Sequence, residues 1–206
     1  MAILLNFKKV SLFEKEQFGI CNISFEIERH RKYHLIANSE EQLNSLAGLI
    51  EGRYQKHSGH IERAPRLFIQ SDRLLMGEKT YSQNAGKWLA LQSEFFKFGN
   101  RTRSKYYFIQ TLKAGHLVEY PIYKLKDDDR IKFALLALAF QESGIILISK
   151  LLTQTLNDEL RGFLHQIIRD TNTTVCLLTC SKDWNLKGEQ QQLPDLIRFD
   201  FSKRHD

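Results

Sequence analysis

Two short apolar stretches restrict the possible folds of this chain more than any other feature. Residues 145–148 read Ile-Ile-Leu-Ile, and residues 174–179 read Thr-Val-Cys-Leu-Leu-Thr. Between them, residues 157–170 place apolar side chains at helical spacing. A strand with one face in water alternates apolar and polar residues, whereas a strand covered on both faces is apolar throughout. Continuous apolar strands separated by a helix therefore predict an α/β fold whose parallel sheet is covered on both faces.

The first third of the chain is predicted to consist mainly of strands. Residues 4–12 and 20–27 alternate apolar and polar side chains, which is typical of half-buried strands. Residues 32–36 predict a third strand and residues 66–70 a fourth. Between these two, Ser39 is typical of a helix N-cap, since acidic residues and then apolar residues at helical spacing follow it.

The middle of the chain, residues 77–124, is richer in aromatic residues and is predicted to be mainly helical. One helical stripe is expected within residues 88–98 and another within 106–117. Pro121 closes this segment. A further helix is expected over residues 127–141, directly before the first apolar strand.

Composition narrows the classes of function. A length of 206 residues suits one domain, or one core with an inserted subdomain. The net charge of +6 is compatible with an acidic partner or a membrane surface, and it falls short of a nucleic-acid signature unless the charge is clustered. No signal peptide and no membrane-spanning apolar run is visible, and the three cysteines have no disulfide-framework spacing. We expect a cytoplasmic protein that reaches a membrane only through a partner, without direct insertion.

The order of these segments resembles the ATP-binding-cassette (ABC) ATPase domain along nearly the whole chain. Tyr33-His34-Leu35-Ile36 is similar to the strand before that family's phosphate loop, and residues 43–49 are similar to the helix after it. Phe68-Ile69-Gln70 resembles the approach to the family's Q-loop, and residues 112–125 resemble the lead-in to its signature motif. The resemblance implies a P-loop NTPase-like core with an N-terminal antiparallel β hairpin region and an inserted helical subdomain.

The resemblance also implies boundaries and a docking surface. Residues 1–206 form one domain, in which 1–76 hold the β region and the first part of the core, 77–124 the helical subdomain and 125–206 the rest of the core. An integral-membrane permease is expected to dock at the helical subdomain and the segment after the Q-loop strand. The candidate interface residues are Gln70, Ser71, Asp72, Arg73, Leu74 and Leu75.

The phosphate loop of the family is missing. A Gly-x4-Gly-Lys-Ser/Thr loop turns backbone N–H groups around the phosphates, its Lys supplies a charge and its hydroxyl holds Mg²⁺. Between Ile36 and Leu43 this chain has Ala-Asn-Ser-Glu-Glu-Gln, without glycine, lysine or threonine. Glu40 and Glu41 place carboxylates where phosphate would bind, and like charges about 5 Å apart repel by roughly 3 kcal/mol at an effective dielectric near 20. We expect no phosphate binding in the family's usual mode.

The remaining motifs of the family are also lost. The signature position reads Leu-Lys-Asp-Asp-Asp over residues 125–129, which favours a solvated helix start over a Mg²⁺ or Ca²⁺ site. In one register Ser149 and Lys150 replace the two acids of Walker B, and in the other Lys150 and Leu151 do. Cys180 stands at the switch histidine. Neither the pair His30 and His34 nor the pair His57 and His60 has the further ligands that zinc needs. We therefore predict a pseudo-ATPase, not an enzyme, with no catalytic residue, cofactor or metal site.

Residues 95–107 interleave aromatic side chains with four basic candidates for a charged surface, Lys97, Arg101, Arg103 and Lys105. The favoured interpretation is two helices with buried aromatics and a basic connecting loop that faces a partner. Contact with anionic lipid headgroups is a second interpretation. Single-stranded nucleic acid, which is bound by stacking and charge neutralisation, is the third.

These observations predict a catalytically inactive ABC ATPase-like subunit with a structural or regulatory role, docked on a permease of a membrane transporter or related membrane complex. It is expected to pair with an active ATPase or with itself, and to stay peripheral on the cytoplasmic face through these partners. Nucleic acid is not expected as a partner. The alternatives are an unusual, weak ATPase and a module that binds nucleic acid or another anionic partner through residues 95–107.

Overall fold

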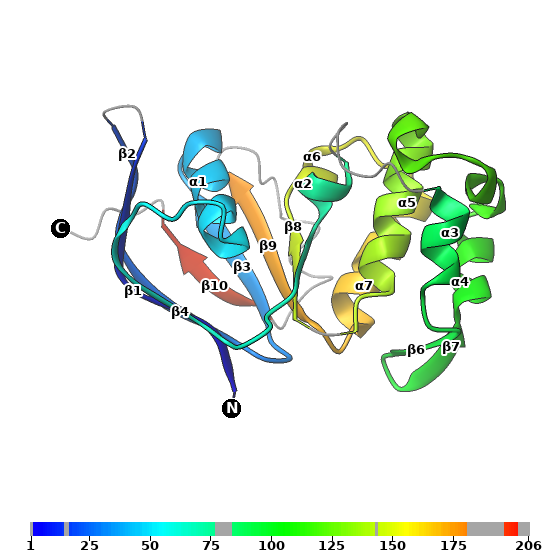
Figure 1. Ribbon diagram of the computed structural model, residues 1–206, viewed down its shortest axis with the longest axis horizontal. Coiled ribbons are helices and arrows are strands. Elements are labelled where there is room, and N and C mark those ends of the chain that lie inside the picture. Colours follow the sequence, from blue (N-terminus) through cyan, green and yellow to red (C-terminus); the bar gives the residue numbers. More distant parts are fainter. Residues whose placement is uncertain (1, 15–16, 77–83, 143, 181–195, 202–206) are drawn as a thin grey trace.

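The computed structural model describes residues 2–14, 17–76, 84–142, 144–180 and 196–201, which form a mixed α/β fold (Figure 1). The strands are β1 (Ile3–Glu14), β2 (Gln17–Glu28), β3 (Lys32–Ala37), β4 (Ser58–Arg63), β5 (Ile69–Ser71), β6 (Phe95–Phe98), β7 (Arg101–Ser104), β8 (Ile145–Ile148), β9 (Thr174–Cys180) and β10 (Ile197–Asp200). The helices are α1 (Glu40–Glu51), α2 (Asp72–Leu75), α3 (Ala85–Ala90), α4 (Lys105–Thr111), α5 (Asp127–Ala139), α6 (Lys150–Thr153) and α7 (Asp158–Asp170), with 3-10 turns η1 (Gly115–Glu119) and η2 (Ile122–Lys124).

The larger sheet is parallel and buried on both faces, which confirms the predicted fold class. Its strand order is β10-β3-β9-β8-β5. Ile145 and Leu147 of β8 belong to a core shared with α1 and β3, whereas Ile146 and Ile148 belong to a core shared with α5 and α7. All four side chains are completely buried. The apolar stretch thus reflects coverage on both faces of the strand.

The smaller sheet is antiparallel, with the order β2-β1-β4, and it shares one core with α1 and the parallel sheet. Phe7 of β1 stacks on Phe25 of β2 with ring centroids 4.5 Å apart. Phe25 also contacts Phe199 of β10 and the adjacent Phe201, at 5.3 and 5.2 Å. Aromatic pairs of this kind add stabilisation beyond the area they bury. The ring cluster therefore joins the two sheets.

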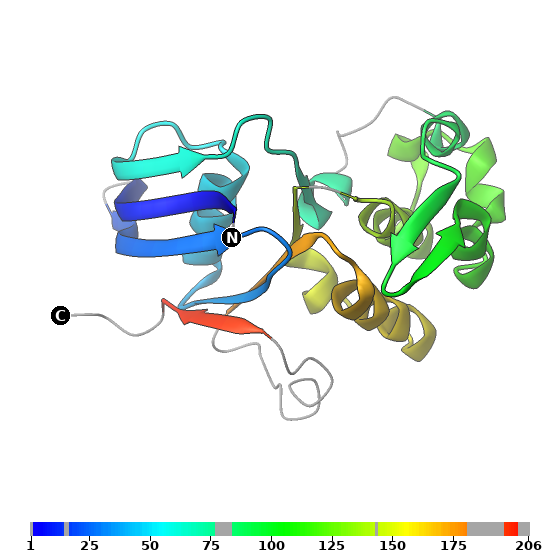
Figure 2. The ribbon, with the colours of Figure 1, turned by 90° about the horizontal axis from the view of Figure 1, so that it is seen from below.

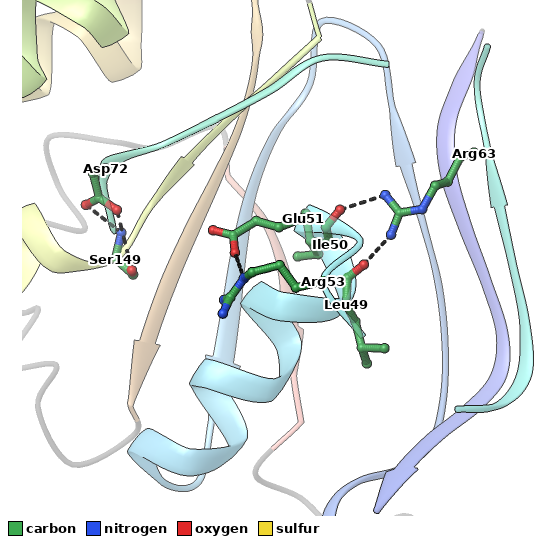
Figure 3. A network of polar contacts seen from close by, with 7 residues as sticks. All are labelled: Leu49, Ile50, Glu51, Arg53, Arg63, Asp72 and Ser149. Carbon is green, nitrogen blue, oxygen red and sulfur yellow. Dashed lines mark hydrogen bonds and ion pairs between the residues drawn. The ribbon is translucent and has the colours of Figure 1, made fainter. Parts of the chain in front are cut away.

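Arg63 of β4 ties the C-terminus of α1 to the antiparallel sheet (Figure 3). Its guanidinium donates one hydrogen bond to the Ile50 carbonyl oxygen, at 2.7 Å, and another to that of Leu49. Both carbonyls belong to the last turn of the helix, where the Leu49 carbonyl also accepts from the Gly52 N–H at 3.2 Å. A cation at a helix C-terminus also interacts favourably with the helix dipole. Gly52 ends the helix in the left-handed conformation, with φ of 78°. This end of α1 is thus fixed by the next strand along the chain.

Residues 95–104 differ from the prediction, because they form a two-stranded hairpin, β6–β7, instead of a helix and a connecting loop. Phe96 and Phe98 are buried while Phe95 and Lys97 are exposed, a period of two that specifies a strand. Gly99 makes the turn with φ of 59°, a conformation that glycine adopts without strain. Helical spacing of the aromatics had concealed this alternation.

Two boundaries also differ from the prediction. Residues 58–63, for which no strand is predicted, form β4, which pairs with β1 from Leu5 to Ser11. The strand expected over residues 66–70 is confined to Ile69–Ser71, since Arg66 has a positive φ of 56° that interrupts extended structure.

Substitution of Gly144, which precedes β8, tests how tightly β8 packs on β5. A Cβ at this position would overlap the Phe68 carbonyl oxygen, and its φ of 82° strains any other residue. We expect Gly144→Ala to lower the free energy of unfolding by about 2 kcal/mol or more, measured by urea denaturation. Gly162→Ala on α7, where a Cβ meets nothing within 4 Å, is the control and should stabilise by up to about 1 kcal/mol. Equal effects of the two substitutions would contradict the close approach.

Candidate nucleotide site and docking groove

The junction between β3 and α1, where the ABC fold would hold phosphate, is closed by hydrogen bonds of the chain itself. Only Asn38 and Ser39 separate the strand from the helix. The Ser39 hydroxyl oxygen accepts from the Gln42 N–H at 3.2 Å, and Gln42 Oε1 accepts from the Asn38 N–H at 2.6 Å. This reciprocal arrangement is a capping box displaced by one residue, because Gln42 reaches the N–H of Asn38 instead of that of the N-cap Ser39. Two donors at the expected phosphate position are therefore already engaged.

The charge of this junction also opposes an anion. Glu40 and Glu41 are exposed in the first turn of α1, where acidic side chains stabilise the helix through its dipole. At the start of α5, Asp127 and Asp128 are likewise exposed, and Asp129 accepts from His116 Nε2 at 2.7 Å. Both helix N-termini that would face phosphate in the ABC fold thus carry carboxylates.

A carboxylate does lie at the end of β8, but it comes from Asp72, just after β5 (Figure 3). Asp72 Oδ2 accepts from the Ser149 N–H at 2.9 Å and from the Leu151 N–H at 2.8 Å. The residue is completely buried. A carboxylate that accepts these backbone hydrogen bonds holds the start of α6 and has fewer lone pairs for a metal ion. Lys150, at the position of a Walker B acid, is exposed.

The environment of Asp72 opposes its ionisation. Burial raises the pKa of Asp72 to about 6, and the backbone hydrogen bonds from Leu151 and Ser149 offset this increase only in part. Within the described residues, no three His, Cys, Asp or Glu side chains come together in a way that could hold a metal ion.

The predicted permease-interface residues are mostly not at the surface, which corrects the sequence prediction. Gln70 is 9% exposed, and Ser71, Asp72 and Leu75 are 0 to 2% exposed. The reason is that β5 pairs with β8 and that α2 folds back against α5 and α6, so these side chains face the interior. Arg73 is half-buried, and the side chain of Leu74 lies outside the described residues.

A groove next to this segment combines a mainly polar lining with two exposed apolar side chains. It lies between the edge strand β5, α3 with the residues after it, and the C-terminal end of α5, with a volume of about 360 Å³. Phe68 and Leu91, which line it, are 54% and 76% exposed, and Trp88 and Gln70 form part of its wall. Helical periodicity assigned Trp88 and Leu91 to a core stripe. Their place beside an edge strand is set by tertiary packing, which local sequence does not specify.

The four basic candidates do not form one patch. Lys97 lies opposite Thr102 on one face of the β6–β7 hairpin, whereas Arg101 and Arg103 lie opposite Phe98 and Phe96 on the other face. Lys105, at the start of α4, reaches the Leu89 carbonyl oxygen at 3.4 Å. The hairpin therefore separates charges that the sequence places side by side.

A pH titration of stability tests the burial of Asp72. Because its pKa is raised from 3.8 to about 6, the folded state binds the proton more tightly than the unfolded state. The protonated carboxyl of Asp72 thus contributes its full stabilisation at pH below 3.8, and this stabilisation is lost as the pH rises through about 6. Compared with Asp72→Asn, the wild type should lose unfolding free energy over this range, measured by urea denaturation at a series of pH values.

The control for this titration is Ser71→Ala, since the buried Ser71 hydroxyl has no hydrogen-bond partner among the described residues. Its stability curve should run parallel to that of the wild type across the same pH range. A constant difference between the wild type and Asp72→Asn would contradict the raised pKa.

Comparisons with known proteins identify the fold. No protein-family model matches the sequence, and no curated protein matches it. A solved protein assigned as a cobalt transport ATP-binding protein, cbiO-2, aligns with a TM-score of 0.64 at 14% identity, over 96% of this chain and 76% of that one. The cbiO1 protein of Clostridium perfringens, part of the ABC transporter complex cbiONQ, aligns with a TM-score of 0.58 at 11% identity, over 88% and 80% of the two chains.

A third solved structure, assigned as the ATP-binding protein of an ABC transporter from Pyrococcus furiosus, aligns over 96% of both chains. Its TM-score is 0.63 at 11% sequence identity. Likeness at such low identity establishes architecture alone. The chain has the fold of ABC transporter ATP-binding proteins, a P-loop NTPase-like core with an antiparallel β region.

Proposed function

We propose that this chain is a catalytically inactive ABC ATPase-like subunit with a structural or regulatory role in a membrane transporter or related complex. The observation that carries the proposal is the capping box of Ser39 and Gln42, which occupies the phosphate position on a retained ABC fold. The carboxylates of Glu40 and Glu41 and the engagement of Asp72 by backbone donors support the same conclusion.

The proposal includes a permease partner at the groove between β5 and α3. Leu91 and Phe68 expose large apolar surfaces there, beside a polar wall that includes Gln70 and Gln92, and an amphipathic helix of a membrane protein has the matching chemistry. In the described part of the chain, no helix combines the length and apolar character needed to cross a membrane. Membrane attachment through such a partner, with a second ATPase chain or a second copy of this chain alongside, fits these observations.

The two alternatives have less support. A weak ATPase would need a rearranged site around Gln70, whose side chain lies instead in the wall of the groove. A nucleic-acid-binding module would need the charge of residues 95–107 on one face, and the hairpin places Lys97 on the face opposite Arg101 and Arg103.

Phosphate release from Mg·ATP tests the catalytic part of the proposal. The purified chain should release phosphate at the rate of a buffer blank, because it lacks the groups that position metal and γ-phosphate. The weak ATPase would be supported, and the proposal overturned, by turnover that rises with protein concentration. That turnover should also fall in Gln70→Ala and remain in the control variant Gln110→Ala on α4.

Co-purification from native membranes tests the docking part. Leu91→Glu replaces the most exposed apolar side chain of the groove with a charge, so recovery of a multi-spanning membrane protein with the chain should fall by about tenfold or more. Tyr123→Glu, on the 50% exposed Tyr123 outside the groove, is the matched control and should leave recovery unchanged. Equal recovery with both variants would rule the groove out as the docking surface.

A further inference from the structure

A basic cleft lies at the amino-terminal ends of the strands of the parallel sheet, on the side opposite the β3–α1 junction. It is lined by residues of the turn that joins β2 to β3, of the tip of the β6–β7 hairpin and of the C-terminal end of α7. Figure 2 shows the course of these elements in the ribbon. β3 begins at Lys32 and β9 begins at Thr174, so this edge holds the amino ends of the strands. The cleft has a volume of about 750 Å³, within the range of pockets that hold small molecules. It is thus separate from the position where the ABC fold would hold nucleotide.

Positive charge dominates the cleft. Four permanently charged side chains line it, namely Lys32, Arg101, Arg103 and Arg169. Among the described residues of its lining, Asp170 is the single carboxylate, and Arg169 Nε holds one of its oxygens at 2.8 Å. Cations gathered from three separate elements repel one another unless an anion lies between them.

Contacts within the protein hold several of these groups in place. The Arg103 guanidinium lies over the Tyr107 ring, 4.4 Å from its centroid. The Lys32 ammonium donates to the Arg169 carbonyl oxygen at the end of α7. The Gly99 N–H donates to the Asp170 carbonyl oxygen at 2.5 Å, which anchors the hairpin tip against the helix end. Groups that are already ordered lose less conformational entropy when a ligand binds.

Neutral polar groups complete the lining. The side chains of Asn100, Gln166 and Asn172 contribute amides. His30 Nδ1 contacts the Asn172 carbonyl oxygen, and because a carbonyl can only accept, this nitrogen carries the hydrogen. His30 Nε2 then remains as the second hydrogen-bonding atom of the ring. Such groups recognise hydroxyls or the uncharged part of a phosphorylated molecule.

We propose that this cleft binds a small anion with two or more phosphate groups. Three of the four cations are arginines, whose planar guanidinium matches two phosphate oxygens at once. The cations come from three elements that converge on one concave site, which favours a compact oligophosphate over an extended nucleic-acid strand or a flat membrane surface. Arg101 and Arg103 belong to the inserted subdomain and Lys32 and Arg169 to the core, so the ligand bridges the two parts.

Isothermal titration with sodium tripolyphosphate, without Mg²⁺, at about 0.15 M salt tests the proposal, since surface charge alone is largely screened there. The wild type should bind one equivalent. The variants Arg101→Glu and Arg103→Glu should each weaken binding by about tenfold or more, because each replaces a phosphate donor with a repelling charge. Lys97→Glu is the matched control. It makes the same charge change on the opposite face of the same hairpin, and should alter affinity by less than about threefold.

Three outcomes would overturn the proposal. One is the absence of tripolyphosphate binding by the wild type. Another is an equal loss of affinity in Lys97→Glu and Arg101→Glu, which would indicate that the overall positive charge of the hairpin, and not the cleft, attracts the anion. The third comes from parallel titrations with a single-stranded RNA oligonucleotide and with vesicles that contain phosphatidylserine. If either binds through Arg101 more tightly than tripolyphosphate does, the cleft serves a macromolecule or a membrane. None of these measurements depends on ATP hydrolysis, so they are independent of the proposed loss of catalysis.

Discussion

The burial of β8 and β9 on both faces is the constraint on which the rest of the structure depends. Side chains of β9 alternate between two cores as those of β8 do, with Val175 and Leu177 on one side and Cys176 and Leu178 on the other. One core requires α1 and the antiparallel sheet as a cover, and the other requires α5, α7 and the inserted subdomain. Because the strands are parallel, this arrangement also creates two chemically distinct edges, one with the carboxyl ends and one with the amino ends of the strands.

At the carboxyl edge, the β3–α1 junction satisfies backbone donors with side chains of the chain itself. The first amides of a helix need partners, which an ABC ATPase supplies with a phosphate loop and a bound nucleotide. Here the Ser39 hydroxyl accepts from the Gln42 N–H, an N-cap interaction that contributes about 1 kcal/mol, and the Gln42 side chain accepts from the Asn38 N–H just before the helix. The start of α1 is therefore stabilised by side chains of the chain itself. Asp72 does the same at the end of β8, where its carboxylate holds the start of α6.

Sequence predicted those parts of the molecule that depend on local pattern. The continuous apolar strands and the Ser39 N-cap were predictable, because double burial and capping each leave a short, specific pattern. The β6–β7 hairpin was missed, since Phe95, Phe96 and Phe98 fit a helical stripe as well as an alternating strand until the turn at Gly99 is considered. The burial of Asp72 was also missed, because its partners Ser149 and Leu151 are nearly 80 residues away, at separations of 77 and 79.

The two edges of the sheet carry opposite charge, and this separation has a physical consequence. Glu40 and Glu41 begin α1, and aspartates begin α5, which runs antiparallel to β8, so carboxylates collect where the strands end. Lys32 and Arg169 lie at the opposite edge, where the hairpin adds Arg101 and Arg103. Among these residues, the amino edge offers an anion guanidinium and ammonium partners, whereas the β3–α1 junction offers carboxylates. This is the distribution of charge that the proposed oligophosphate site requires.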